Sequence, residues 1–205
     1  MKRHSLGVIP FRPNRLPGLT LPLASASGLR AAQISVLPEF ESVQPFRRER
    51  WGELEAFQPR ILVGYGFDLR RLTDKVQAGE IEMPLVDRAI VALTDCGSSP
   101  ISDALRDHVW NVFGVPVYEL IVAPGCRLLA CECEAHDGWH VQEGAKAYLV
   151  KGELVYDAPP LTCAYTGFTG NIETQPCECG RKTTRLKNLT PCLPRPYERR
   201  LAAIA

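Results

Sequence analysis

The stretch Ile61-Leu62-Val63-Gly64-Tyr65 decides how this sequence folds, because it has the composition of a short buried strand. Residues 67–78 follow with apolar side chains at helical spacing, and Gly79 predicts the end of that helix. The apolar positions of the helix are Leu69, Leu72 and Val76. A second apolar run of strand length, Ala89-Ile90-Val91-Ala92-Leu93, comes next. A strand, a helix and a strand in this order predict a parallel βαβ unit.

A second helix and a third strand extend the same pattern. Ser99-Pro100 resembles an N-cap followed by a first helical residue, and Gly114 predicts the end of the helix. Its apolar stripe consists of Ile101, Leu105, Val109, Val112 and Phe113. Residues 115–120 then predict a third strand. The fold class is therefore α/β, with a parallel sheet and right-handed crossovers.

Two cysteine pairs point to a metal. Cys131-Glu132-Cys133 is followed by His136 and His140, and Cys177-Glu178-Cys179 lies roughly forty residues further on. Zinc takes four tetrahedral ligands, so these six candidates leave the choice of ligands open. Thiols in a Cys-x-Cys pair bridge each other poorly, because both side chains project in the same direction along an extended segment. We therefore expect a reducing compartment and zinc; the alternative is a set of reduced thiols without a metal.

The length of 205 residues suits one good-sized domain or two small ones. After Pro124 the pattern changes to short β-type segments at 141–156 and 163–172, interrupted by glycine and proline. The expected organisation is an irregular basic arm at 1–35, an α/β unit at 36–125, a small zinc-stabilised β subdomain at 126–185 and a basic C-terminal tail at 186–205.

Charge and hydropathy limit the possible partners. No apolar run approaches the ~20 residues that cross a bilayer, so no membrane association is expected. Five basic residues and no acidic one precede Glu39, whereas seven basic residues and one acidic residue lie from Arg181 onward. Basic terminal segments of this kind favour packing on the acidic middle of the chain or binding to an acidic partner. Nucleic-acid binding is not favoured, because no aromatic stacking surface accompanies the basic residues. Prolines in the first stretch argue against a transit peptide, so we predict a cytoplasmic protein.

An ordered series of motifs resembles the phenylacetate–CoA ligases and related adenylate-forming enzymes. The series covers about two-thirds of the chain. Its segments are 57–65, 106–118, Pro124-Gly125, 132–134, 136–141, 152–155, Thr169-Gly170 and 177–181. The resemblance implies the C-terminal half of an adenylate-forming N-domain. Because some members carry zinc at matching places, it also implies Cys133, His140, Cys177 and Cys179 as the four ligands, with Cys131 and His136 as extra groups.

The sequence departs from that family at the positions that carry the family's catalytic chemistry. Ser25-Ala26-Ser27-Gly28 lacks the glycine pair and lysine of the family's phosphate loop, and Ser99 replaces a glutamate. Ile121 and Val122 stand where the family has the hydroxyl and carboxylate that bind adenylate and magnesium. Asn171 replaces the aspartate that holds the ribose. The mobile C-terminal domain with its catalytic lysine is also expected to be missing. We therefore do not expect a working ligase.

Three functional hypotheses follow. The first is a zinc-binding, non-catalytic homologue that acts as an accessory or partner-binding subunit in a homo- or hetero-oligomer. The second is a residual adenylate-forming enzyme, or a nucleotide or acyl binder, in which Tyr118 and Asn171 contact the ligand and a second chain supplies the missing groups. The third is catalysis by zinc with Glu132, Glu134 or Asp137 as base, but the surplus of ligands favours a closed structural site.

Overall fold

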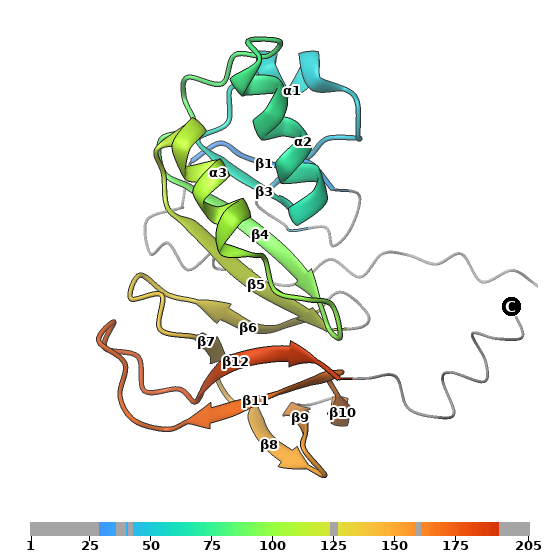
Figure 1. Cartoon of the computed structure of the whole chain (residues 1–205), viewed down its shortest axis with the longest axis vertical. Coiled ribbons are helices and arrows are strands. Elements are labelled where there is room, and N and C mark those ends of the chain that lie inside the picture. Colours follow the sequence, from blue (N-terminus) through green and yellow to red (C-terminus); the bar gives the residue numbers. More distant parts are fainter. Residues whose placement is uncertain (1–28, 36–39, 41–42, 124–126, 159–160, 193–205) are drawn as a thin grey trace, which may run out of the picture.

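The fold is organised around one nine-stranded sheet (Figure 1). The computed structural model describes residues 29–35, 40, 43–123, 127–158 and 161–192. From one edge to the other, the strands are β11 (Phe168–Glu173), β12 (Arg185–Pro191), β7 (Trp139–Val141), β6 (Arg127–Glu132), β5 (Val117–Ala123), β4 (Ala89–Asp95), β3 (Ile61–Tyr65), β1 (Ala31–Gln33) and β2 (Gln44–Pro45).

Strands β2, β1, β3, β4 and β5 form the parallel half of the sheet. Helix α1 (Trp51–Phe57) precedes β3, α2 (Gly66–Gln77) connects β3 to β4, and α3 (Asp103–Phe113) connects β4 to β5. Helical crossovers of this kind are what parallel neighbours require. The three strands and two helices expected from the hydrophobic pattern are confirmed, although β5 runs from Val117 to Ala123 rather than over 115–120.

Both faces of the parallel half are buried, which explains the unbroken apolar runs. On the helical face, Leu62 of β3 and Ile90 of β4 belong to one core cluster with Leu69 of α2 and Leu105 of α3. Figure 1 shows α2 and α3 on the same side of the sheet. The opposite face forms a second cluster, whose buried members are Ala31, Phe40, Val43, Ile61, Val63, Val91, Leu93, Leu120 and Val122.

The start of α3 corrects the prediction that placed its N-cap at Ser99. The N-cap is Ser102, whose Oγ accepts a hydrogen bond from the Leu105 N–H at 3.3 Å. The Ile101 N–H instead donates to the buried carboxylate of Glu119 at 2.9 Å. Because β5 binds the segment before the helix in this way, α3 begins only after Ser102. Gly114 ends the helix with φ +65°, as expected.

Antiparallel strands continue the same sheet beyond β5. Strand β6 pairs with β5, β7 with β6, β12 with β7 and β11 with β12. The sheet therefore crosses residue 125, where the sequence suggested a boundary between two units. Strand β12 also corrects the expectation of a tail from residue 186, because buried Leu186 and Leu189 pack this strand into the core. Residues 193–205 lie outside the described part of the chain.

The expected irregular arm at 1–35 is corrected at its end. Ala31–Gln33 form β1, which pairs with β3, and all three residues are buried. The alternation of apolar and polar residues that usually reveals a strand is absent from β1. Its two small alanines and Gln33, whose side-chain amide donates to the Ser35 carbonyl, are buried on both faces of the sheet. Residues 1–28, including Ser25–Gly28, lie outside the described residues.

A three-stranded antiparallel sheet packs on the second half of the large sheet. It consists of β8 (Lys146–Val150), β9 (Glu153–Ala158) and β10 (Leu161–Tyr165), in the order β10-β9-β8. Leu154 and Tyr156 of β9 share a core cluster with Phe168 of β11 and Leu186 of β12. The β-type segments expected after Pro124 are thus confirmed as strands.

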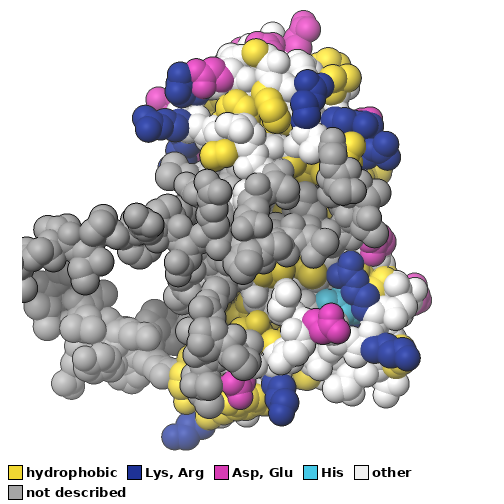
Figure 2. Space-filling model, turned by 180° about the vertical axis from the view of Figure 1, so that it is seen from behind, with side chains coloured by type: hydrophobic (Ala, Val, Ile, Leu, Met, Phe, Trp, Pro, Cys, Tyr) yellow, Lys and Arg dark blue, Asp and Glu magenta, His cyan; other side chains and the backbone are white. Residues whose placement is uncertain are grey.

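The surface carries charges of both signs. On the face seen in Figure 2, Lys and Arg side chains are interspersed with Asp and Glu side chains. Among the described residues, no helix is both long enough and apolar enough to span a bilayer.

Candidate metal centre

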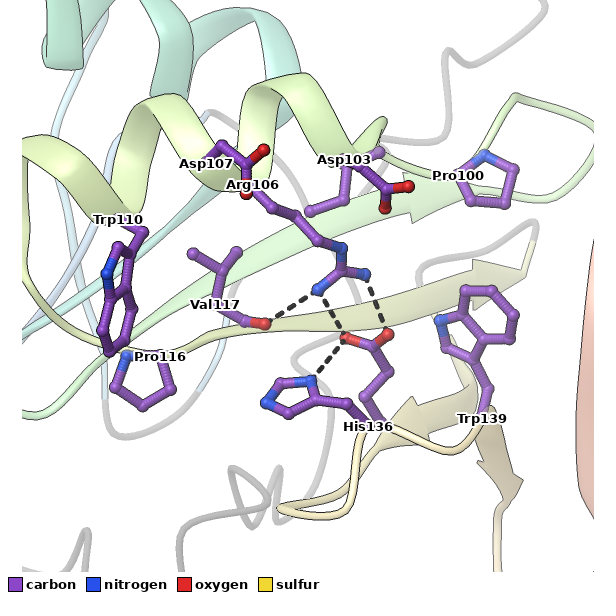
Figure 3. Close-up of a pocket in the computed structure, with 11 residues that line it drawn as sticks. Pro100, Asp103, Arg106, Asp107, Trp110, Pro116, Val117, His136 and Trp139 are labelled. Atoms are coloured by element: carbon purple, nitrogen blue, oxygen red, sulfur yellow. Dashed lines mark hydrogen bonds and ion pairs between the residues drawn. The ribbon is translucent and has the colours of Figure 1, made fainter.

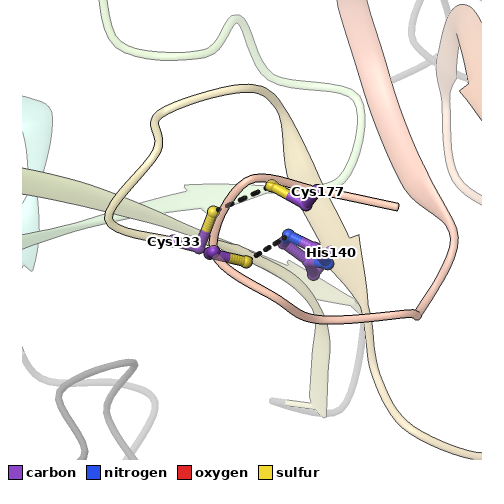
Figure 4. Close-up of side chains that lie close together, drawn as sticks. Cys133, His140 and Cys177 are labelled. Atoms are coloured by element: carbon purple, nitrogen blue, oxygen red, sulfur yellow. Dashed lines mark hydrogen bonds between the residues drawn. The ribbon is translucent and has the colours of Figure 1, made fainter. Parts of the chain in front are cut away.

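Four potential ligands converge at the antiparallel half of the sheet. The ligand atoms of Cys133, His140, Cys177 and Cys179 all lie within 4.8 Å of one another. Cys133 directly follows β6, His140 lies on β7, and the cysteine pair lies in the loop between β11 and β12. Figure 4 shows the side chains of Cys133, Cys177 and His140 directed toward one another. The structure therefore brings together the four residues that the family resemblance implied.

The turn between β6 and β7 positions the first two ligands. The His136 N–H donates to the Cys133 carbonyl at 3.0 Å, which closes the turn. Gly138 has a φ of +88°, and a Cβ there would lie 2.5 Å from the Leu186 carbonyl oxygen. Only glycine therefore allows β12 to approach this turn so closely. On β7, His140 pairs with Arg185 of β12.

The second loop presents two thiols from one tight turn. The Gly180 N–H donates to the Cys177 carbonyl at 2.9 Å, and Gly180 has a φ of +82°. The Cys177 N–H donates to the Arg181 carbonyl at 3.4 Å. These bonds direct the Cys177 and Cys179 side chains to the same point.

Arg185 connects the two loops. Its Nη1 donates to the Asp137 carbonyl at 3.2 Å and also forms an ion pair with the Asp137 carboxylate. Its Nη2 donates to the Gln175 carbonyl at 3.1 Å. Because Asp137 lies in the first turn and Gln175 in the second loop, this buried guanidinium holds the two halves of the cluster together.

The distances fit a tetrahedral zinc site. Zn–S bonds of about 2.3 Å and a Zn–N bond of about 2.05 Å place two sulfurs about 3.8 Å apart, and a sulfur and a nitrogen about 3.6 Å apart. The Cys133 and Cys177 sulfurs are 3.7 Å apart. The Cys179 sulfur lies 3.4 Å from His140 Nε2. Three thiols and one imidazole are also a ligand set that zinc prefers, so the donors fit this metal in chemistry and in spacing.

Burial shifts the pKa values of two of the four ligand residues, Cys133 and His140. Burial raises the pKa of Cys133 to about 12, because a thiolate without a counter-charge is costly there. Burial, Arg181 and Arg185 lower the pKa of His140, so its imidazole stays neutral, as a ligand must be. Thr183 Oγ1 lies 3.0 Å from His140 Nδ1 and orients Nε2 toward the thiols.

Cys131 and His136, the two extra candidates, lie outside the cluster. The Cys131 sulfur is 3.6 Å from Arg181 Nη1, and its side chain packs on the second core cluster. The His136 ring stacks on Tyr118 with ring centroids 5.1 Å apart. The spacing of the cysteines and histidines could not separate these two residues from the ligands, because the choice depends on which turns meet.

The residues at the family's adenylate-binding positions occupy ordinary places in the fold. Ile121 and Val122 are buried near the C-terminal end of β5, where their side chains pack in two different core clusters. Asn171 lies on β11 opposite Lys187, and Ser99 lies in the connection before α3. Neither the Ile121 nor the Val122 side chain has an atom that could bind a magnesium ion.

A buried charge network was not foreseen from the sequence. Arg106 of α3 donates to both carboxylate oxygens of Glu132, at 2.8 and 3.0 Å, and to Glu119 at 3.2 Å. The Glu119 N–H donates to Glu132 at 2.7 Å, and Thr94 donates to the Glu119 carboxylate. In the sequence, the one sign of this network was Glu119, a glutamate within the apolar run of β5. Its partner Glu132 lies between the two cysteines of the first pair.

The titration of Glu119 gives a testable pH dependence. Burial raises the pKa of Glu119 above its ordinary value, and Glu132 adds to the effect. The folded protein then binds this proton more readily than the unfolded chain, so the contribution of Glu119 to stability rises as the pH falls. As the pH is lowered from neutral toward the ordinary pKa of a glutamate, we expect wild type to gain free energy of unfolding relative to Glu119→Gln, by at most ~1.4 kcal/mol per pH unit.

Urea unfolding of both proteins at each pH measures this difference. Effects of pH on the metal cluster are common to both proteins and cancel in the comparison. A difference that stayed constant, or that grew in favour of the variant at low pH, would contradict the prediction.

Solved structures with a similar fold include two CoA ligases and a coronafacic acid ligase. A structure of 2-hydroxyisobutyryl-CoA ligase in complex with 2-HIB-AMP and CoA matches with a TM-score of 0.60 and 13% identity, over 78% of this chain and 44% of that chain. A long-chain-fatty-acid-CoA ligase from Archaeoglobus fulgidus matches with a TM-score of 0.54 and 11% identity, over 90% and 48%. Coronafacic acid ligase from Pectobacterium brasiliense matches with a TM-score of 0.54 and 13% identity, over 77% and 38%.

The fold is therefore that of part of an adenylate-forming ligase, and this chain spans less than half the length of these matched ligases. Within this fold, the chain carries a cluster of three cysteines and one histidine that could hold a metal ion. No protein-family profile and no curated protein matches the sequence. The closer relationship to phenylacetate–CoA ligases stays a prediction from the sequence motifs.

Proposed function

We propose that the chain is a zinc-stabilised, non-catalytic relative of acyl-CoA ligases that acts as an accessory, partner-binding subunit. The observation that carries this proposal is the burial of Ile121 and Val122 in β5. These two apolar side chains occupy the positions where the family resemblance puts the hydroxyl and carboxylate for adenylate and magnesium. A charged phosphate and its metal ion would gain nothing from these side chains.

Zinc is the cofactor that we propose for the cluster. When bound, it would neutralise the thiolates and link the two loops, and Cys133, His140, Cys177 and Cys179 would hold it. Cys133, His140 and Cys177 are buried, which favours a closed structural site over one that activates water. Because thiol ligands need reducing conditions, we propose the cytoplasm as the compartment.

A second candidate function is residual adenylate formation together with another chain. The observation that favours it is the fold shared with ligases such as 2-hydroxyisobutyryl-CoA ligase, whose structure holds 2-HIB-AMP and CoA. Asn171 on β11 would then contribute a hydrogen bond to the nucleotide. Under this hypothesis a partner chain would supply the phosphate-binding loop and the lysine.

Exchange of pyrophosphate into ATP separates the two functions. We expect the isolated, zinc-loaded chain to show no exchange above the level without protein, with acyl acids of several lengths, because the Ile121 and Val122 side chains offer no group for magnesium or phosphate. An active acyl-CoA ligase run in parallel serves as the positive control. Exchange that requires the chain and falls with Asn171→Ala would overturn the non-catalytic proposal.

A further inference from the structure

A pocket between α3 and the β6–β7 turn remains unexplained by the metal cluster. It has a volume of about 470 Å³, within the range of small-molecule sites. Trp110 and Pro116 lie toward one end of the pocket and Trp139 toward the other, with Arg106 between them (Figure 3). The remaining lining residues are Pro100, Ile101, Asp103, Asp107, Val117, Glu132 and His136.

Arg106, the one cationic side chain among the residues that line the pocket, is not available for an anion. Both of its terminal nitrogens already donate, to Glu132, to Glu119 and to the Val117 carbonyl at 2.8 Å. An acyl carboxylate or a phosphate would have to displace these buried partners and leave them without a counter-charge. The pocket therefore disfavours the anionic groups that adenylate-forming ligases handle.

The walls carry more negative than positive charge. Asp103 and Asp107 lie one helical turn apart on α3, and both are exposed. Neither takes part in an ion pair within the described part of the chain. The carboxylates of Asp103 and Asp107 therefore make the electrostatic potential at the mouth of the pocket negative.

Two indole rings complete this environment. Trp110 is 53% exposed, which is unusual for so large an apolar side chain, and it projects from the same helix as the two aspartates. Indole faces attract cations, and a planar guanidinium combines stacking on an aromatic ring with paired hydrogen bonds to a carboxylate. Acidic groups and tryptophans around one hollow therefore match a guanidinium better than a compact ammonium ion or a neutral group.

The geometry points to this pocket as a binding site for an alkylguanidinium group, held between Trp110 and Trp139 and paired with Asp103 or Asp107. The inference is independent of the metal cluster and of the proposed lack of catalysis. An arginine side chain of a partner protein and a free guanidino compound carry the same chemistry, and the experiment below distinguishes them.

The indole N–H resonances of the zinc-loaded chain provide the test. The sequence has three tryptophans, and Trp51 packs against the helical core away from the pocket, so it is an internal control. We expect butylguanidinium to shift the resonances of Trp110 and Trp139 saturably, with little effect on Trp51. Butylurea has a similar shape without the charge and should shift neither, and added salt should weaken the binding of butylguanidinium.

Two variants test whether butylguanidinium binds in this pocket. Trp110→Ala should weaken the binding about three- to tenfold. Asp107→Asn should weaken it about two- to fivefold, whereas Glu143→Gln, an equal change of charge at an exposed residue outside the pocket, should leave it unchanged. Both substituted pocket residues are exposed, so the fold should tolerate the changes.

A capped peptide with one arginine distinguishes an arginine side chain of a partner protein from a free guanidino compound. Binding of this peptide at least as tight as that of butylguanidinium indicates a protein partner, and preference for the small molecule indicates a free guanidino ligand. Either result supports the site. Equal binding of butylurea, absence of saturable shifts, or binding unaffected by Trp110→Ala and Asp107→Asn would overturn it.

Discussion

Cys179→Ser should abolish zinc binding at the proposed site and unfold the region around the β6–β7 turn and β12. Cys179 contributes one of four ligand atoms that lie within 4.8 Å of one another. Structural zinc contributes on the order of 10 kcal/mol to the folding of small zinc domains, so losing most of its affinity should cost this protein more than about 4 kcal/mol. Metal analysis of the purified protein and its thermal unfolding measure the two effects. Cys133→Ser should behave in the same way.

Cys131→Ser is the matched control for this prediction. Cys131 is adjacent to the cluster and half-buried, but its sulfur contacts Arg181 rather than the other thiols. The variant should keep about one zinc ion per chain under reducing conditions. A strong chelator should destabilise wild type and this control alike. Wild-type protein that contains almost no zinc and is unaffected by the chelator would contradict the metal centre.

Arg106→Met should have the second-largest effect, because it leaves two buried carboxylates without their cation. Glu119 is fully buried and Glu132 is nearly so, and Arg106 binds both. Breaking a buried charge network by removing one partner costs about 3–5 kcal/mol. Urea unfolding at neutral pH measures this loss of stability.

Two comparisons show whether the loss comes from the charges. Arg70→Met replaces an exposed arginine of α2 and should change stability little. Lowering the pH should recover part of the loss in Arg106→Met, because the protonated form of Glu119 needs no cation. An equally large loss of stability in Arg70→Met would show that the buried charges are not its source. So would a loss in Arg106→Met that increased at low pH.

The hydrophobic pattern predicted the parallel half of the fold, because each strand and helix there carries its own periodicity. Residues 61–65 and 89–93 are continuous apolar runs, and both are buried on two faces of a sheet. The pattern was less informative beyond residue 125. There β7 is only three residues long and β8 only five. Such strands are held by backbone pairing with neighbours, which composition does not reveal.

The start of α3 shows how a distant contact overrides a local signal. Ser99-Pro100 has the composition of a helix start, yet the Ile101 N–H is bonded to Glu119 of β5. Glu119 lies 18 residues away in the chain, so no local pattern could include it. The buried network of Arg106, Glu119 and Glu132 was missed for the same reason, since its members lie on a helix and two strands.

The sequence by itself determined the α/β class, the order of its helices and strands in the parallel half, and the presence of two cysteine-containing clusters. These features depend on side-chain type and spacing over a few residues. Only the tertiary structure decided that Cys133, His140, Cys177 and Cys179 meet while Cys131 and His136 face elsewhere. That choice depends on Gly138 letting β12 approach the β6–β7 turn and on Arg185 joining the two loops. The contact of Gly138 with Leu186 and that of Arg185 with Asp137 each join residues more than forty positions apart, and only the folded backbone sets their distance.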